Sequence, residues 1–211
     1  MPRPKMTPAQ LESTREQILD TALAILQQSG PEAITSRAIA ERMGVAHMSL
    51  YTYFENQAAI LRALSQREMA KWRTQQRVFD QRAETENIPR VVEDLLRFFI
   101  AFARENPNLY RMAWVMPEVG GETPAESRLR MQATVGQLST LLQKGMAADA
   151  FVPRNPFLAA GTVLAMVNAP FILFHSGKLV EPVLRDQMVD EVLSAAMGYL
   201  KTMPIRPIVS D

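Results

Sequence analysis

Residues 36 to 57 read SRAIAERMGVAHMSLYTYFENQ, and they decide the fold. The first eight residues, capped by Thr35 or Ser36, have the pattern of a short helix. Gly44 can take the left-handed conformation that ends a helix, and a third helix of barely two turns follows it. Two short helices joined by a glycine turn predict a helix-turn-helix unit.

Helical patterns continue on both sides of this unit. Thr7 and Gln10 match a capping box at the start of a helix over about residues 8 to 28. Asn56 is placed to cap a fourth helix, which continues to about Val78. The short stretch is therefore expected to be the centre of a domain built from helices alone.

The third helix has an expected inner side and an expected outer side. Ala40 is small enough for the two short helices to approach, and we expect Val45 and Leu50 to fill the crevice between them. With Leu50 inward, a rotation of 100° per residue points Met48 and Thr52 outward.

The outer side carries groups that suit the major groove of DNA. Ser49 and Tyr51 flank Met48 and Thr52, and this helix has no acidic side chain. Hydroxyls can donate or accept at base edges, thioethers and aromatic rings can contact thymine methyls, and tyrosine hydroxyls can reach phosphates. Backbone N–H groups at the starts of the second and third helices add donors for phosphate.

Each of these residues also has a purely structural interpretation. Tyr51 and Tyr53 can pack against the core, and His47 can be an ordinary surface residue. Arg37, in the first turn of the second helix, can be a solvated charge. The occupied inner side favours an outward role for Tyr51 and Thr52, and the place of Arg37 beside a helix start favours a phosphate contact.

The composition limits the class of protein. Of the 211 residues, 47% are apolar and 21% are charged, which indicates a folded protein of one large domain or of a small domain joined to a larger one. The lack of cysteine excludes disulfides, and the N-terminus has no signal-peptide pattern, so we expect a cytoplasmic protein. Residues 1 to 77 carry ten Lys or Arg against seven Asp or Glu, which permits an anionic partner at this end.

Groups that could support catalysis are scarce. The chain has two histidines, no cysteine, no Gly-rich phosphate loop and no HExxH motif. We therefore expect no enzyme activity, no cofactor and no metal site.

Residues 13 to 61 together resemble the N-terminal DNA-binding domain of the tetracycline-repressor (TetR) family of transcriptional regulators. The resemblance rests on TREQIL, the SG turn, TSRAIAERMGV and LYTYFEN. Carried over position by position, the family pattern implies DNA contacts from the start of the second helix and from the third helix. The implied contact residues are Thr35, Ser36, Arg37, His47, Met48, Ser49, Tyr51, Thr52, Tyr53 and Gln57.

One position departs from the family pattern. Family members commonly have a lysine that contacts phosphate where this chain has Gln57. Gln57 can still donate a hydrogen bond, but the counterion release that a lysine provides is lost. Arg3 and Lys5 in the N-terminal arm can compensate for that loss.

The rest of the chain has only helical patterns. Residues 88 to 105 have a wide apolar face, and further helices are expected from about 124 to 148 and from 182 to 201. No strand pattern is present, so we expect an all-α protein. A helix-turn-helix domain over 8–60 precedes an antiparallel helical bundle over 61–203 that binds a ligand and dimerises.

Residues 157 to 174 form an 18-residue apolar run, which is just long enough for a membrane span. Asn168 and Pro170 lie within this run, and the chain has no second run of the kind. Both facts favour a buried helix over a membrane span.

The last two helices are expected to pair with those of a second copy. Ala195, Ala196 and Gly198 in the last helix permit close approach of another helix. Such pairing gives a seam about a two-fold axis, and the dimer would read two half-sites of a palindromic operator.

A looser resemblance links ENPNLYRMAWV, residues 105 to 115, and the apolar helix to one C-terminal subgroup of the family, although the subgroup's His-Gly pair is Asn168-Ala169 here. In the family, the bundle encloses a pocket for a small molecule, whose binding respaces the recognition helices and releases DNA. Each candidate pocket residue can equally be plain core. These candidates are Phe102, Tyr110, Trp114, Met166, Asn168, Phe171 and His175.

These features lead to the hypothesis of a homodimeric transcriptional regulator, in the first place a repressor. It would bind a palindromic operator and be released by a small apolar or amphipathic effector. The alternative is a helical ligand-binding or interaction protein without specific DNA binding, for which Gln57 is the only sequence support.

Overall fold

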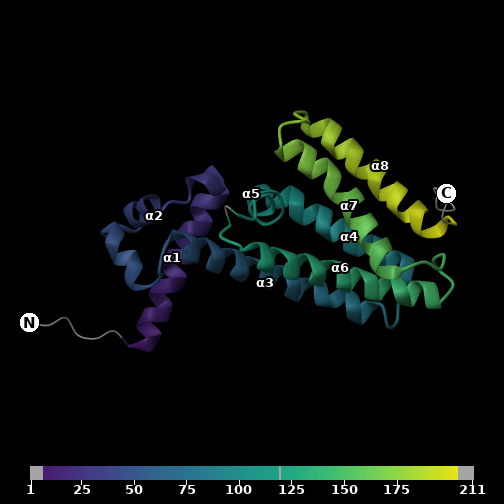
Figure 1. The fold of residues 1–211 in the computed structure, drawn as a ribbon, viewed down its shortest axis with the longest axis horizontal. Helices are drawn as coiled ribbons and strands as arrows, with labels where there is room; N and C mark the ends of the chain where they lie inside the picture. Colours follow the sequence, from purple (N-terminus) through teal and green to yellow (C-terminus); the bar gives the residue numbers. More distant parts are fainter. Residues whose placement is uncertain (1–6, 119, 204–211) are drawn as a thin grey trace, which may run out of the picture. The chain divides into compact units, whose positions relative to one another are not determined.

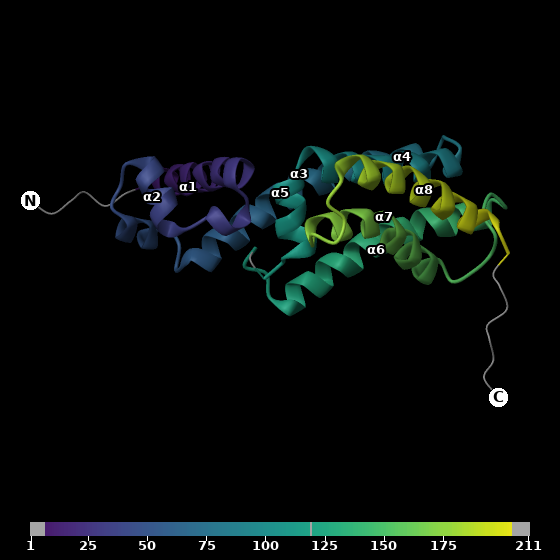
Figure 2. The same cartoon turned by 90° about the horizontal axis from the view of Figure 1, so that it is seen from above.

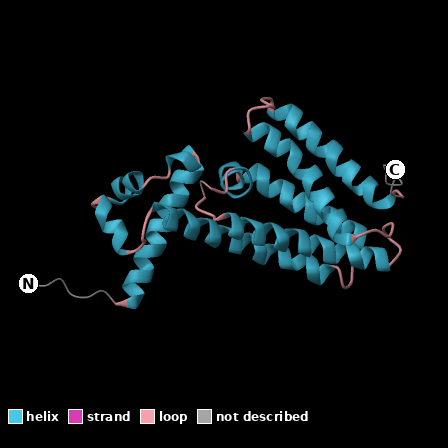
Figure 3. Cartoon of the chain, viewed as in Figure 1, coloured by secondary structure: helices cyan, strands magenta, loops and turns pink. Residues whose placement is uncertain are grey.

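The computed structural model describes residues 7–118 and 120–203, and this part of the chain is built from helices and loops without a β-strand (Figure 3). The helices form two compact units, and neither is continuous in sequence. The first unit extends to Arg73 and includes Asn106–Ser127, whereas the second takes Thr74–Glu105 and the residues from Arg128 onward. The predicted all-α fold class is confirmed.

The helices follow one another in the order that the sequence predicts (Figure 1). Both α3 and α6 contribute to each of the two units. In chain order the elements are α1 (Pro8–Ser29), the 3₁₀ turn η1 (Pro31–Ala33), α2 (Ser36–Met43), the 3₁₀ helix η2 (His47–Thr52), α3 (Gln57–Arg82), α4 (Ile88–Glu105), α5 (Pro107–Tyr110), the π-helical turn η3 (Arg111–Val115), α6 (Pro124–Ala147), α7 (Pro156–His175) and α8 (Pro182–Lys201).

The first helices begin at the capping residues that the sequence predicts. The Gln10 N–H donates to Thr7 Oγ1 (3.3 Å) and the Thr7 N–H donates to Gln10 Oε1 (2.9 Å), which completes the capping box of α1. Thr35 Oγ1 accepts a backbone N–H from the first turn of α2 (3.0 Å). Asn56 Oδ1 does the same for α3 (2.9 Å).

The turn after α2 is a Schellman motif centred on Gly44, whose φ of 68° and ψ of 31° lie in the left-handed region. The Gly44 N–H donates to the Glu41 carbonyl (3.1 Å) and the Val45 N–H to the Ala40 carbonyl (3.0 Å). The prediction that Val45 fills the crevice is wrong, because its side chain is 42% exposed. Ala40 and Leu50, at 2% and 1% exposed, close the crevice without it.

Apolar side chains from α1, α2, η2 and α3 form the core of the first unit. The short helix α5 also packs against α1, so the segment after α4 completes this core. The fully buried members include Ile18, Leu26, Ile39, Leu50, Ile60 and Leu64.

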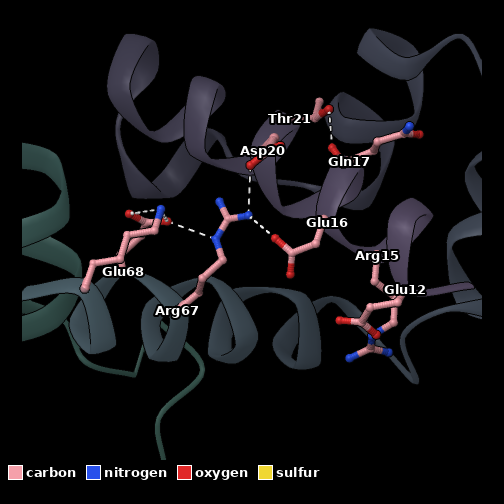
Figure 4. Close-up of polar contacts among 9 residues, drawn as sticks. Glu12, Arg15, Glu16, Gln17, Asp20, Thr21, Arg67 and Glu68 are labelled. Atoms are coloured by element: carbon pink, nitrogen blue, oxygen red, sulfur yellow. Dashed lines mark hydrogen bonds and ion pairs between the residues drawn. The ribbon is translucent and has the colours of Figure 1, made fainter. Parts of the chain in front are cut away.

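Charged side chains also join α1 to α3. Arg67 of α3 donates from Nη1 to Glu16 Oε2 (2.7 Å) and Asp20 Oδ1 (2.8 Å), and from Nε to Glu68 Oε1 (2.9 Å) (Figure 4). Only 16% of the Arg67 side chain is exposed. Burial opposes the charge of Arg67, but the three carboxylates outweigh it and raise the pKa of the guanidinium.

Helices α4, α7 and α8 form the centre of the second unit. Helices α7 and α8 lie side by side and antiparallel, and α4 packs against both of them (Figure 2). Their buried side chains include Val91, Leu95, Phe99, Val163, Val167, Phe171, Val189 and Leu193.

Helix α7 contains the apolar run that the sequence also matched to a membrane span. Among the described residues, α7 is the single helix that is long and apolar enough to cross a bilayer. Val163, Val167 and Phe171 of α7 have no exposed surface, and the helix packs on α8 and α4. These contacts support the buried-helix interpretation.

Replacing Arg67 tests the charged link between α1 and α3. Arg67→Met keeps the apolar stem and removes the charge, so we expect the free energy of unfolding to fall by about 1–3 kcal/mol. Urea unfolding followed by circular dichroism measures the change. The matched control is Arg97→Met: Arg97 pairs with Glu93 (2.7 Å) but is 58% exposed, and its loss should change stability by less than about 0.5 kcal/mol. Equal effects of the two substitutions would contradict the role given to Arg67.

Candidate nucleic-acid interface

The exposed side of η2 results from the burial of its other side. Leu50 and Phe54 are buried, whereas Met48 is 63% exposed and Thr52 is exposed as well, as the predicted register requires. η2 is a 3₁₀ helix, in which the Tyr53 N–H donates to the Leu50 carbonyl (2.9 Å). The result is a short, narrow helix that presents Met48 and Thr52 to solvent.

Arg15 of α1 fixes the end of η2. Its guanidinium carbon lies 4.2 Å from the centre of the Phe54 ring, and its Nη1 donates to the Tyr53 carbonyl. Sequence reasoning missed this role, because only the fold brings Arg15 to residues 38 positions further along the chain.

Tyr51 connects η2 to the start of α2. Its hydroxyl donates to Ser36 Oγ (3.3 Å), and its ring meets the edge of His47 with 6.4 Å between the ring centres. Ser36 is only 6% exposed, so the structure places this predicted contact residue beneath Tyr51. The Tyr51 ring keeps 38% of its surface exposed.

The start of α2 presents groups that suit an anion. Thr35 is exposed and its side chain caps the helix, which leaves the other backbone N–H groups of the first turn directed along the helix axis. Arg37 is exposed in the same turn. The structure therefore brings Arg37 and the helix start of α2 into one short module with η2.

Gln57 points back into the domain. Its Nε2 donates to the carbonyl of Ile34 (2.9 Å), the residue that precedes the cap of α2. This bond ties the start of α3 to the start of α2. A primary amide has two N–H donors, so the second one remains available to a phosphate.

The other predicted contact residues lie along η2. His47 is exposed, while Ser49 and Tyr53 are partly buried, and the Ser49 hydroxyl donates to a carbonyl of the preceding turn (2.5 Å). Arg3 and Lys5, which we expected to assist Gln57, lie outside the described residues.

The segment after α4 is attached to the helix-turn-helix within the first unit. Arg111 of η3 forms an ion pair with Glu32 of η1 (2.5 Å), and the Asn108 side chain donates to the Gln27 carbonyl of α1 (3.3 Å). No pattern in the sequence indicates these contacts, since 79 and 81 residues separate the partners.

The residues predicted to line a ligand pocket are divided between the two units, and the pocket stays a prediction. Tyr110 and Trp114 belong to the first unit and stack with their ring centres 5.6 Å apart. In the second unit, Asn168 and Phe171 are buried, and the Asn168 side-chain amide donates to the Leu164 carbonyl (2.8 Å). That unit also contains Phe102, Met166 and His175.

Known proteins match both the interface and the fold. The family described as "Bacterial regulatory proteins, tetR family" matches residues 18–64. The Tetracycline repressor protein class A from transposon 1721 of Escherichia coli is 26% identical over 195 residues, which cover 91% of this chain and 76% of that protein. The class C repressor of Escherichia coli is 44% identical over 52 residues, which cover 25% of this chain and 24% of that protein.

A solved structure matches most of the fold. The transcriptional regulator FadR from Bacillus subtilis in complex with stearoyl-CoA has a TM-score of 0.67, and the match covers 87% of this chain and 98% of that chain. The identity is 15%, so this likeness shows the fold alone.

The family match covers the residues that form the interface. Residues 18–64 extend from α1 through α2 and η2 into α3 and include the module described above. The resemblance derived from the sequence is confirmed for this domain, and over residues 18–64 the chain is similar to the tetracycline-repressor family of bacterial transcriptional regulators.

Proposed function

We propose that the protein is a ligand-responsive transcriptional repressor that binds a palindromic operator as a homodimer. The exposed side of η2 carries this proposal. Met48 and Thr52 lie at the surface above the buried Leu50, and residues 44 to 54 include no acidic side chain. A short helix of this kind fits the major groove, where thioethers contact thymine methyls and hydroxyls contact base edges.

Phosphate contacts come from the groups around η2 in this proposal. Arg37 and the backbone N–H groups at the start of α2 hold a phosphate beside the groove. The Tyr51 ring is exposed and its hydroxyl lies at the same helix start, where it can reach the same strand. Gln57 supplies its second amide N–H.

The dimer forms through α7 and α8 of two copies. Helix α7 presents apolar side chains to solvent at intervals of seven residues, namely Leu158, Ala165 and Ile172. On α8, Ala195 and Gly198 are exposed, and a Cβ added at Gly198 would meet no atom within 4 Å. Ala196 was expected at the same seam, but it is buried in the core of its own unit, so Ala195 and Gly198 provide the close approach. A second copy of the chain covers these surfaces around a two-fold axis.

The effector is a small apolar or amphipathic molecule. The regulators similar to this chain include one solved with stearoyl-CoA and one named for tetracycline, which are molecules of this general kind. We propose that this protein acts in the cytoplasm, on the chromosome, and controls transcription through binding alone.

Selection of genomic fragments by the purified protein tests the function. We expect the enriched fragments to share a palindrome that one dimer binds, with an affinity that falls steeply with salt. Sequence-blind binding, or no binding, would favour the interaction-protein alternative.

A charge at the apolar seam tests the dimer. Ile172→Arg should raise the dimer dissociation constant, measured by sedimentation, at least tenfold. Thr85→Arg, in an exposed turn, should leave that constant unchanged.

Alanine substitutions on η2 test which residues read the bases. Met48→Ala and Thr52→Ala should each change the preference at particular base pairs by about 1–3 kcal/mol, because each removes a base-edge contact. Tyr53→Phe should weaken binding evenly across sequences. Binding to a panel of single-base operator variants measures these effects, and unchanged preferences in both alanine variants would remove η2 as the reading element.

A lysine at position 57 tests whether the start of α3 faces a phosphate. Gln57→Lys should tighten operator binding and steepen the plot of log affinity against log salt by about one counterion. Gln66→Lys, at an exposed position of the same helix, adds the same charge and serves as the control. Equal changes in operator affinity and salt dependence in the two variants would show a general effect of charge. Unchanged affinity in Gln57→Lys would show that residue 57 lies away from the phosphates.

A further inference from the structure

Large apolar side chains are exposed at one place only among the described residues of the first unit. They are Val45, Met48 and Tyr51, which are 42%, 63% and 38% exposed. These three residues are called the apolar triad below. Exposed apolar residues scattered singly over a protein surface are ordinary. Their confinement to residues 45 to 51 indicates a contact surface.

Met48 and Tyr51 share one side of η2. A 3₁₀ helix has three residues per turn, so side chains three positions apart line up along its axis. The rise is about 2 Å per residue, which places these two side chains about 6 Å apart along the axis. The Tyr51 hydroxyl bonds to Ser36 (3.3 Å), so the exposed surface of its ring remains for an apolar contact.

Val45 lies in the turn that leads into η2. Its N–H donates to the Ala40 carbonyl (3.0 Å), which fixes its backbone directly after Gly44. The residue at this place in a Schellman motif commonly packs against the helix that has just ended, which accounts for the covered part of Val45. The exposed part is not explained by the turn. Three residues of chain span at most about 11 Å, so Val45 lies within that distance of Met48.

The surroundings of the apolar triad suit DNA better than a protein partner. Residues 44 to 54 include no acidic side chain, and Arg37 is exposed at the start of α2. His47 and Thr52, beside the triad, are exposed and polar. A stable protein interface buries about 800 Å² on each partner, which three side chains among polar neighbours do not provide. In the major groove, by contrast, the C5-methyl group of thymine is a single small apolar target.

We propose that Val45 is a further specificity-determining residue, and that together with Met48 and Tyr51 it contacts the C5-methyl groups of thymines in each operator half-site. The proposal rests on the proposed function as a DNA-binding regulator and specifies the chemical group that is recognised. The two separations, at most about 11 Å and about 6 Å, together span about five base-pair steps of about 3.4 Å. The contacted thymines therefore fall within one run of about five base pairs.

Uracil lacks only the C5-methyl group of thymine, so a change in the DNA tests the proposal without altering the protein. The operator obtained by genomic selection is synthesised with one thymine at a time replaced by uracil, and its affinity for the purified protein is measured by fluorescence anisotropy. We expect the affinity to fall about fourfold at each contacted thymine, because one methyl group loses its apolar contact, and to stay unchanged elsewhere. Unchanged affinity at every uracil would overturn the proposal.

Substitution of Val45 shows whether this residue contacts one of the methyl groups. Val45→Ala should weaken binding to the thymine operator about fourfold and remove the effect of uracil at one position while preserving it at the others. Val45→Thr keeps the shape of the side chain and should reduce the uracil effect at the same position. Val78→Ala, at a valine of α3 that is 47% exposed, is the matched control and should change neither operator. Equal weakening on the thymine and uracil operators in Val45→Ala would show a structural role and overturn the assignment of Val45.

The same titrations separate this inference from the proposed function. If a palindrome is selected and bound specifically but uracil has no effect at any position, the recognition of methyl groups is wrong and the repressor function stands. If no DNA sequence is selected, the repressor function fails and the inference fails with it.

Discussion

The burial of Leu50 and Phe54 is the constraint on which the surface proposed to contact DNA depends. A 3₁₀ helix of six residues is too short to persist alone, so its conformation and its orientation come from packing against α2 and from the burial of Leu50. Because these two side chains are buried in the core, Met48 and Thr52 lie on the opposite side of η2 and are exposed to solvent. Arg15 completes the arrangement from α1 through the Phe54 ring and the backbone next to it.

The predicted contact residues differ in whether they also make hydrogen bonds inside the domain. Ser36, Tyr51 and Gln57 make bonds inside the domain and hold the starts of α2, η2 and α3 in register. Met48 and Arg37 are exposed, and the proposed function assigns them contacts with DNA only. Hydroxyl and amide groups can hydrogen-bond to DNA, and the same groups can hydrogen-bond between neighbouring short helices. Sequence alone therefore cannot separate the two tasks.

Local signals made much of the fold predictable, and long-range contacts account for the rest. Caps and turns act within a few residues, so Thr7, Thr35 and Gly44 marked helix ends correctly. The prediction that Val45 fills the crevice was wrong, because the size of the crevice depends on residues that the local sequence pattern around Val45 does not reveal. The pair of Arg111 with Glu32 joins residues 79 apart, which no periodicity reveals. For the same reason, the sequence marked Tyr110 and Trp114 as candidates for a ligand pocket but did not indicate that Trp114 meets Trp72 edge-on.

The discontinuity of the first unit has a consequence for biosynthesis. The helix-turn-helix leaves the ribosome first, but its unit is complete only when the chain reaches Ser127, which is 54 residues beyond Arg73. At bacterial translation speeds this interval lasts roughly 3–10 s, far longer than the time in which a small helical unit folds. During that time Trp72 of α3 lacks Trp114, which it meets edge-on in the complete unit. The order of synthesis therefore separates the start of the first unit from its completion, which waits for α5 and η3.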